Sequence, residues 1–144
     1  MEKEGRKSVI FLCTGNSARS QMAEGMMRHL RGNEFEVFSA GTEPKGIHPL
    51  AIEVMAEIGI DISTQRSKHL DKYLIKEFDY SVTLCDHADK TCPLFPGEGK
   101  RIHQGFSDPA AIDGTEEERL EVFRKIRNRL RAFMLSFPPQ SDNA

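Results

Sequence analysis

A cysteine and an arginine near the start of the chain are spaced as a nucleophile and an anion-binding group. Cys13 directly follows the apolar run 9–12, and Arg19 comes six residues later, after small and polar residues. Between a buried strand and a helix, such a loop turns its backbone N–H groups inward and cradles anions. The same field favours a negative sulfur, and a guanidinium binds tetrahedral oxyanions through paired N–H groups. The pattern predicts a thiolate aimed at a phosphate-shaped group.

The loop itself supplies the expected binding groups. Ser20 can donate its hydroxyl to the sulfur, or it can satisfy a backbone group in the first turn of the helix. The lysine of a GxxxxGK[ST] loop is missing, which disfavours nucleotide hydrolysis. The predicted substrate-binding residues are Thr14, Gly15, Asn16, Ser17, Ala18, Arg19 and Ser20.

Two further cysteines, Cys85 and Cys92, lie seven residues apart in the polar segment CDHADKTC. An extended segment would hold them too far apart for a disulfide, whereas a helix or loop would let them approach. The alternative is a zinc site made by Cys85, His87 and Cys92, with His103 as fourth ligand. This spacing matches no common zinc motif, so we expect no bound metal.

Asp108 precedes a proline and fits a general acid that protonates a leaving group. The structural alternative is a turn aspartate in the sequence S-D-P. The remaining histidines, His29, His48 and His69, are expected to be exposed or to lie at helix ends and not to act in catalysis.

The composition is that of an ordinary globular protein. The chain has 144 residues, of which 38% are hydrophobic and 29% charged, and its net charge of −2 gives no general attraction to nucleic acid or anionic membranes. The start is polar, unlike a secretory signal, and no apolar run is long enough to span a membrane. We expect one domain over 1–144 with flexible tails at 1–7 and 138–144, monomeric and cytoplasmic, where thiols stay reduced.

Strand and helix patterns alternate along the chain. Strands are predicted at 8–12, 35–39, 80–84 and 101–104, and helices at 18–30, 49–58, 70–78 and from the Thr115 N-cap, with Glu118 completing a capping box, to the proline pair at 138–139. This alternation predicts an α/β fold, a parallel sheet of order 2-1-3-4 with helices on both faces. Cys13, Cys85 and Asp108 should then meet at the carboxyl edge of the sheet.

The run CTGNSARS resembles the phosphate-binding loop of the low-molecular-weight protein tyrosine phosphatases and the related thioredoxin-coupled arsenate reductases. The longer FLCTGNSARSQMAEG is similar to the reductase branch, as are SAG, GIDIS, VTLC, GFSDPA and GTEEE further along. Both branches often carry another loop cysteine where this chain has Ala18. In the phosphatases, tyrosines typically follow the Asp-Pro pair and frame an aromatic substrate, whereas Ala110 and Ala111 follow it here.

The resemblance implies reduction of arsenate through a relay of three thiols. Cys13 would attack arsenate, Cys85 would attack Cys13 to release arsenite, and Cys92 would then attack Cys85 and carry the disulfide to the surface. Arg19 and Asp108 would assist, thioredoxin would be the external reductant, and no cofactor would be bound. Phosphate and sulfate would also fit the loop. The alternatives are a tyrosine phosphatase, or an oxyanion-binding or redox-sensing module without turnover.

The resemblance also raises the question of a potassium ion, because some of these reductases bind one beside the loop. This chain keeps three of the matching positions, Asn16, Glu24 and Ser39. Where the potassium binders have Thr and Asp, it has Arg66 and Lys68. We expect one of these cations to pair with Glu24 in place of the metal; the alternative is that both point to solvent.

Overall fold

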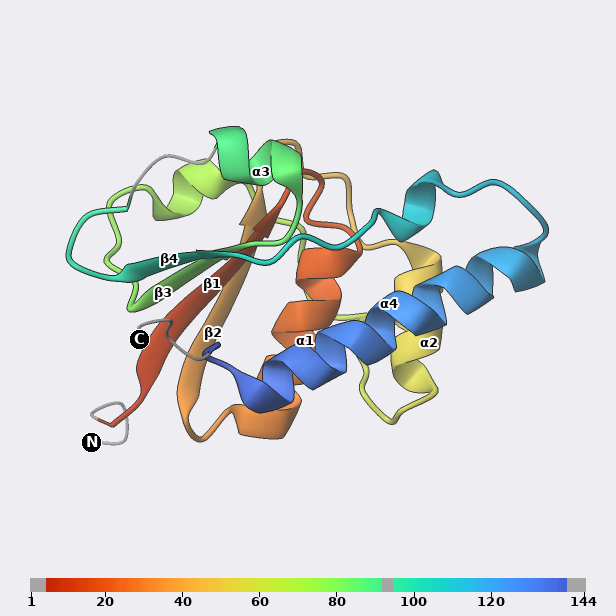
Figure 1. Cartoon of the computed structure of the whole chain (residues 1–144), viewed down its shortest axis with the longest axis horizontal. Helices are drawn as coiled ribbons and strands as arrows, with labels where there is room; N and C mark the ends of the chain where they lie inside the picture. The colour runs from red at the N-terminus through yellow and green to blue at the C-terminus, as the bar shows by residue number, and fades with distance from the viewer. Residues whose placement is uncertain (1–4, 92–94, 140–144) are drawn as a thin grey trace.

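The computed structural model describes residues 5–91 and 95–139. It contains the predicted four-stranded parallel sheet in the order β2-β1-β3-β4 (Figure 1). The strands are β1 (Lys7–Cys13), β2 (Phe35–Gly41), β3 (Tyr80–Thr83) and β4 (Lys100–His103). The α-helices are α1 (Arg19–Arg31), α2 (Pro49–Ala56), α3 (Asp86–Thr91) and α4 (Glu116–Ser136), and the 3₁₀ helices are η1 (Leu70–Tyr73) and η2 (Pro109–Ala111).

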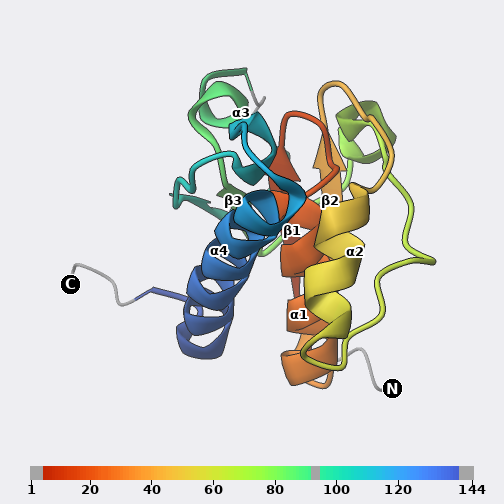
Figure 2. The same ribbon diagram turned by 90° about the vertical axis from the view of Figure 1, so that its right-hand side faces the viewer.

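The alternation of side chains along β1 divides the core between two faces of the sheet. Val9 and Phe11 belong to the larger core cluster, which α1, α2 and α4 share. Ile10 and Leu12 point the other way, into a smaller cluster formed with η1 and the start of α3. Figure 2 shows α1, α2 and α4 grouped together. Within the described ranges no helix is long and apolar enough to cross a membrane.

The last helix follows its sequence signals closely. The Thr115 hydroxyl accepts from the Glu118 N–H at 3.1 Å, and the Glu118 carboxylate accepts from the Thr115 N–H at 2.8 Å, which confirms the capping box. The apolar side chains at Leu120, Phe123, Ile126 and Leu130 recur at helical spacing along α4 and are buried. Helix α4 packs against both α1 and α2.

The prediction of a helix over 70–78 is wrong beyond Tyr73, where a single 3₁₀ turn ends. Tyr73, Phe78 and Phe38 pack edge to face, with ring centroids 5.3–6.0 Å apart. A continuing helix would not place Phe78 there, so burial of the aromatic rings outweighs the local helix pattern. Strand β1 begins at Lys7, inside the predicted N-terminal tail.

Candidate active site

The loop between β1 and α1 has the tight curvature that an anion cradle requires. Asn16 adopts a left-handed conformation with φ of +44°, which asparagine tolerates better than most residues. Gly41, at the end of β2, lies directly against this loop. A Cβ atom there would come within 2.5 Å of the Thr14 carbonyl oxygen and 2.6 Å of the Cys13 carbonyl oxygen. Only glycine lets the neighbouring strand end approach the loop so closely.

The sulfur of Cys13 lies at the bottom of this loop and is buried. The hydroxyl of Ser20 is 2.9 Å from the sulfur, and the Asn16 Nδ2 donates to the same hydroxyl oxygen at 2.8 Å. Because the serine oxygen already accepts from Asn16, its own proton is free to point at the sulfur. This arrangement suits a negatively charged sulfur.

Among the described residues, no side chain makes a capping hydrogen bond at the N-terminus of α1, which faces the cradle. The N-cap of this helix is Ala18. Arg19 is buried, and its Nη1 donates to the Phe106 carbonyl at 3.0 Å. Its Nε is also buried and has no hydrogen-bond partner among the described residues. A buried donor of this kind is costly unless a ligand accepts from it. The cradle therefore offers donors to a tetrahedral anion.

Asp108 makes the contacts of a turn aspartate and also lies beside the hollow over Cys13. Its Oδ1 accepts from the Ala110 N–H at 3.0 Å and so caps η2, as a turn aspartate does. Its Oδ2 lies 3.8 Å from Arg19 Nη2, and its side chain remains 46% exposed. The same carboxyl group lines the hollow above Cys13. It is therefore placed where a proton donor for a leaving group would stand.

The second cysteine emerges from the sheet beside the first. Strand β3 ends at Thr83, two residues before Cys85, but the Leu84 N–H still donates to the Leu12 carbonyl of β1 at 2.8 Å. The Cys85 sulfur is buried, lies 3.5 Å from the Thr14 hydroxyl and accepts from the Ala88 N–H at 3.4 Å. Both Cys13 and Cys85 are free thiols. Cys92 lies outside the described residues.

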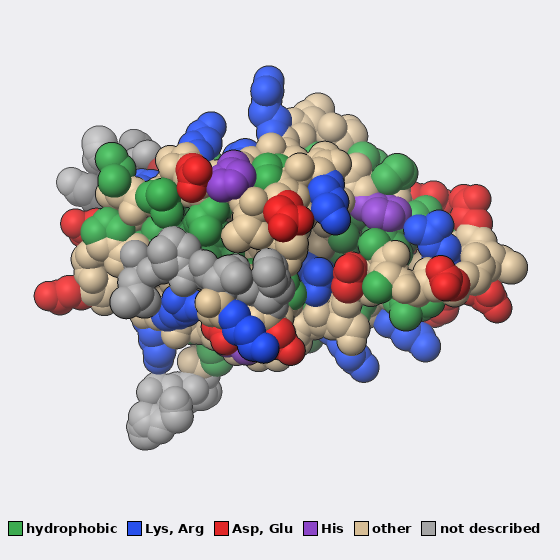
Figure 3. All heavy atoms as spheres, turned by 90° about the horizontal axis from the view of Figure 1, so that it is seen from above, with side chains coloured by type: hydrophobic (Ala, Val, Ile, Leu, Met, Phe, Trp, Pro, Cys, Tyr) green, Lys and Arg blue, Asp and Glu red, His purple; other side chains and the backbone are tan. Residues whose placement is uncertain are grey.

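Two adjacent hollows at this edge contain the two sulfurs and share one arginine. The hollow over Cys13 has a volume of about 300 Å³, and the one over Cys85 about 390 Å³; Arg19 lines both. Figure 3 looks onto this edge, where basic, acidic and histidine side chains are mixed. Lys45 and His48 also line the hollow over Cys13. The sequence analysis did not consider Lys45 and placed His48 at a helix end outside catalysis, because neither residue belongs to the loop motif.

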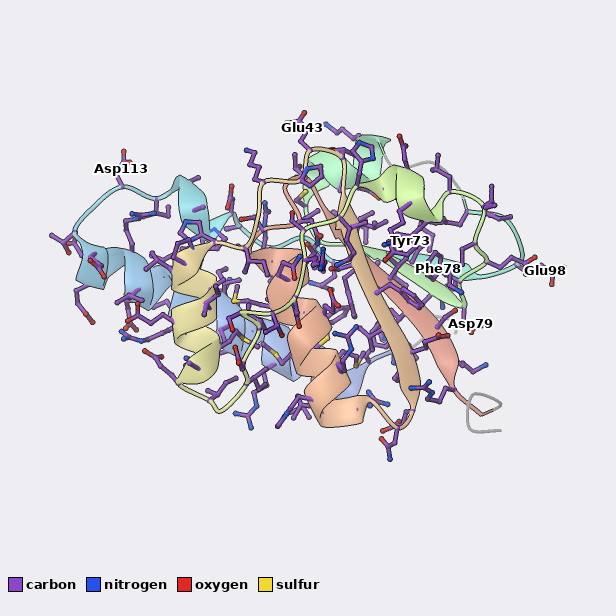
Figure 4. The ribbon with its side chains drawn as sticks, turned by 180° about the vertical axis from the view of Figure 1, so that it is seen from behind. Glu43, Tyr73, Phe78, Asp79, Glu98 and Asp113 are labelled. Atoms are coloured by element: carbon purple, nitrogen blue, oxygen red, sulfur yellow. The ribbon has the colours of Figure 1, made fainter. Side chains whose placement is uncertain are left out.

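A larger hollow of about 770 Å³ lies at the opposite edge of the sheet. Figure 4 shows Asp79 and Glu98, two of its lining residues, far from Glu43, which follows β2 at the edge that carries the cysteines. Asp79 accepts from the Ser8 N–H at 2.8 Å and so fastens β1 to the turn before β3. No cysteine is among the described residues that line this hollow, so we place the chemistry at the hollow over Cys13.

His103, the fourth ligand considered for the zinc alternative, contacts two other polar residues. His103 Nδ1 lies 2.8 Å from the Thr83 hydroxyl, and its Nε2 lies 3.0 Å from Asp86 Oδ1. Both ring nitrogens are therefore engaged with neighbouring polar groups. Within the described part of the chain, no group of three His, Cys, Asp or Glu residues is arranged to hold a metal ion.

Lys68 occupies the position beside the loop where the resemblance suggested a potassium ion. Its Nζ lies 3.3 Å from Glu24 Oε1, 3.5 Å from Ser39 Oγ and 2.6 Å from the Arg66 carbonyl oxygen. The Lys68 side chain is only 14% exposed, and burial lowers its pKa, against the opposing effect of Glu24. The side chain of Arg66 is exposed instead. These residues do not fit a bound cation, and the expected ion pair with Glu24 is confirmed for Lys68.

The Glu24 cluster is connected to the nucleophile through hydrogen bonds. Ser39 Oγ donates to Glu24 Oε1 at 2.5 Å, and Asn16 Nδ2 donates to Ser39 Oγ at 2.9 Å. The Asn16 Oδ1 accepts from the Lys68 backbone N–H at 2.7 Å. Since Asn16 also contacts Ser20, the buried ion pair helps to fix the loop around the sulfur.

Comparisons with known proteins agree with this geometry. The family model of the low molecular weight phosphotyrosine protein phosphatases matches residues 8–141. An arsenate reductase of Halalkalibacterium halodurans is 50% identical over 125 residues, covering 87% of this chain and 90% of that protein. A solved arsenate reductase in a phosphate-binding state has a TM-score of 0.72 and 34% identity, covering 90% of this chain and 94% of the other. A thioredoxin-dependent arsenate reductase of Corynebacterium glutamicum has a TM-score of 0.66 and 31% identity, covering 92% of this chain and 62% of the other.

Proposed function

The chain belongs to the low molecular weight phosphotyrosine protein phosphatase family, and on this premise we propose that it is an arsenate reductase that uses thioredoxin as its reductant. The observation that carries the proposal is the second buried free thiol, Cys85, in contact with the cradle through Thr14. A phosphatase needs only one cysteine. The names of the similar proteins, arsenate reductase and thioredoxin-dependent arsenate reductase, support the same assignment.

The first step takes place in the hollow over Cys13. The loop N–H groups and the free Nε of Arg19 bind the arsenate oxygens, and the Cys13 thiolate attacks arsenic. One oxygen leaves as water after protonation, for which Asp108 is the nearby acid. The product is a thiol–arsenate adduct on Cys13.

The second step is the reduction. The Cys85 thiolate attacks the Cys13 sulfur, the sulfur–arsenic bond breaks, and its electron pair stays with arsenic, which goes from As(V) to As(III). Arsenite leaves, and a Cys13–Cys85 disulfide remains. Cys92 then attacks Cys85 and frees Cys13, and the thioredoxin dithiol reduces the resulting Cys85–Cys92 disulfide by thiol exchange. A reducing compartment such as the cytoplasm suits this cycle.

A tyrosine phosphatase is the second candidate, since Cys13, Arg19 and Asp108 would suffice for it. Ala110 lines the hollow where an aromatic residue would frame an aryl phosphate. The small side chain offers little surface for a ring to pack against. We therefore expect at most a weak side activity in the hydrolysis of phosphate esters.

One assay separates these functions. Purified protein is mixed with arsenate, thioredoxin, thioredoxin reductase and NADPH, and NADPH oxidation is compared with hydrolysis of an aryl phosphate. We expect many turnovers of NADPH per chain that depend on arsenate. Aryl phosphate hydrolysis without arsenate-dependent NADPH oxidation would assign the phosphatase function. Anion binding without either activity would assign a sensor or binding module.

The Lys68–Glu24 pair leads to a prediction about monovalent cations. At equal ionic strength, kcat/KM for arsenate is expected to be the same in sodium and potassium buffers, because the ammonium group already occupies the site. The matched variant is Lys68→Asp, which restores an oxygen ligand and is expected to gain a potassium-specific rise. A potassium-specific rise in the wild-type chain would contradict the replacement.

A further inference from the structure

His48 is held rigidly at the start of α2. As the N-cap of this helix, it accepts from the Leu50 N–H through Nδ1 at 3.1 Å. Its own backbone N–H donates to the carbonyl of Ser17 in the loop at 3.0 Å. Its ring lies against Phe123 of α4, with centroids 4.8 Å apart. The backbone of His48 is thus tied to the loop, and its ring is held by Leu50 of α2 and Phe123 of α4.

This orientation determines which ring nitrogen carries a proton. Because Nδ1 accepts from Leu50, the neutral imidazole carries its hydrogen on Nε2. The described residues make no hydrogen bond to Nε2, although the ring is half-buried. His48 lines the hollow over Cys13 together with Arg19. A donor without a protein partner thus belongs to the wall of the anion-binding hollow.

The surroundings of the ring lower the pKa of His48 below its ordinary value. Burial has the largest effect and lowers the pKa of His48, and Arg119 of α4 lowers it further. Asp108, before η2, acts in the opposite direction and raises it. Lys45, on the same loop as His48, and Arg19 of α1 line the same hollow. This shift favours the neutral imidazole, which can donate through Nε2, among mostly basic neighbours.

We infer that His48 binds the substrate oxyanion, its Nε2–H donating to an oxygen of the tetrahedral anion held over Cys13. This inference rests on the proposed function, because it places the anion in the hollow above the nucleophile. The capping bond to Leu50 sets the tautomer and aims the donor. His48 thus both caps the start of α2 and binds the anion.

The test separates the capping role of His48 from its binding role. Asparagine and serine are good N-caps, so His48→Asn and His48→Ser keep the bond to Leu50 but remove the ring N–H. His48→Ala removes both. Inorganic phosphate is the probe, and its affinity is measured from the protection of Cys13 against iodoacetamide, followed by mass spectrometry of the peptide that contains Cys13.

We expect both capping variants to bind phosphate about five-fold more weakly than the wild type, with little change in Tm. His48→Ala should show the same weakening and also lose about 4 °C in Tm. In the reductase assay, KM for arsenate should rise by a similar factor while kcat changes less. If either capping variant folds and binds phosphate as tightly as the wild type, His48 is only a helix cap.

Phosphate protection does not depend on turnover, so the two proposals fail separately. Weaker protection in the capping variants together with no arsenate reduction by the wild type would overturn the proposed function and leave the inference standing. Unchanged protection in the capping variants together with normal arsenate reduction would overturn the inference about His48 and leave the proposed function standing.

Discussion

Cys13→Ser is expected to lower arsenate reduction by at least about 10,000-fold and to remove any phosphatase side activity to the same extent. Both reactions begin with attack by the Cys13 sulfur, and a serine hydroxyl is a much weaker nucleophile near neutral pH. The measurement is NADPH oxidation coupled through thioredoxin, beside hydrolysis of an aryl phosphate. The hydrogen bonds of Ser20 and Asn16 remain available, so the loop should keep its shape.

The control for this variant is anion binding without chemistry. Phosphate should still raise the Tm of Cys13→Ser, because Arg19 and the loop N–H groups are unchanged. Arsenate reduction by Cys13→Ser at a rate within ten-fold of the wild type would show that another thiol is the nucleophile.

Cys92→Ser is expected to limit the protein to a single turnover of arsenate reduction. The first two thiols can still form the adduct and reduce it, so about one arsenite should be released per chain. The chain should then stop as a Cys13–Cys85 disulfide, because no thiol carries the disulfide onward. Rapid quenching and mass spectrometry of the alkylated peptides would identify that disulfide, and aryl phosphate hydrolysis should persist in the reduced variant.

The matched control is Cys85→Ser, which should release no arsenite while keeping hydrolysis. The buried Cys85 sulfur contacts Thr14, so its loss removes the only described thiol near the cradle besides Cys13. Normal cycling of Cys92→Ser with thioredoxin would contradict the three-thiol relay, since Cys85 would then be reduced directly.

The sequence predicted the parts of this protein that depend on local physics. The parallel order 2-1-3-4 follows from alternating strands and helices with right-handed crossovers. The anion cradle follows from small residues between a buried strand and a helix, and the capping box at Thr115 and Glu118 from a short pattern. The cradle and the capping box depend on interactions within a few residues. The sheet order depends on the alternation of strands and helices, which repeats along the whole chain.

The tertiary structure alone decided how side chains from distant segments meet. His48 was predicted to lie at a helix end, and it does, but only the packing of α2 beside the loop places its ring in the hollow over Cys13. Lys68, and not Arg66, reaches Glu24, and the aromatic cluster around Phe78 ends the helix predicted over 70–78. These outcomes depend on burial and charge pairing between segments far apart in sequence, whose relative positions no local pattern specifies.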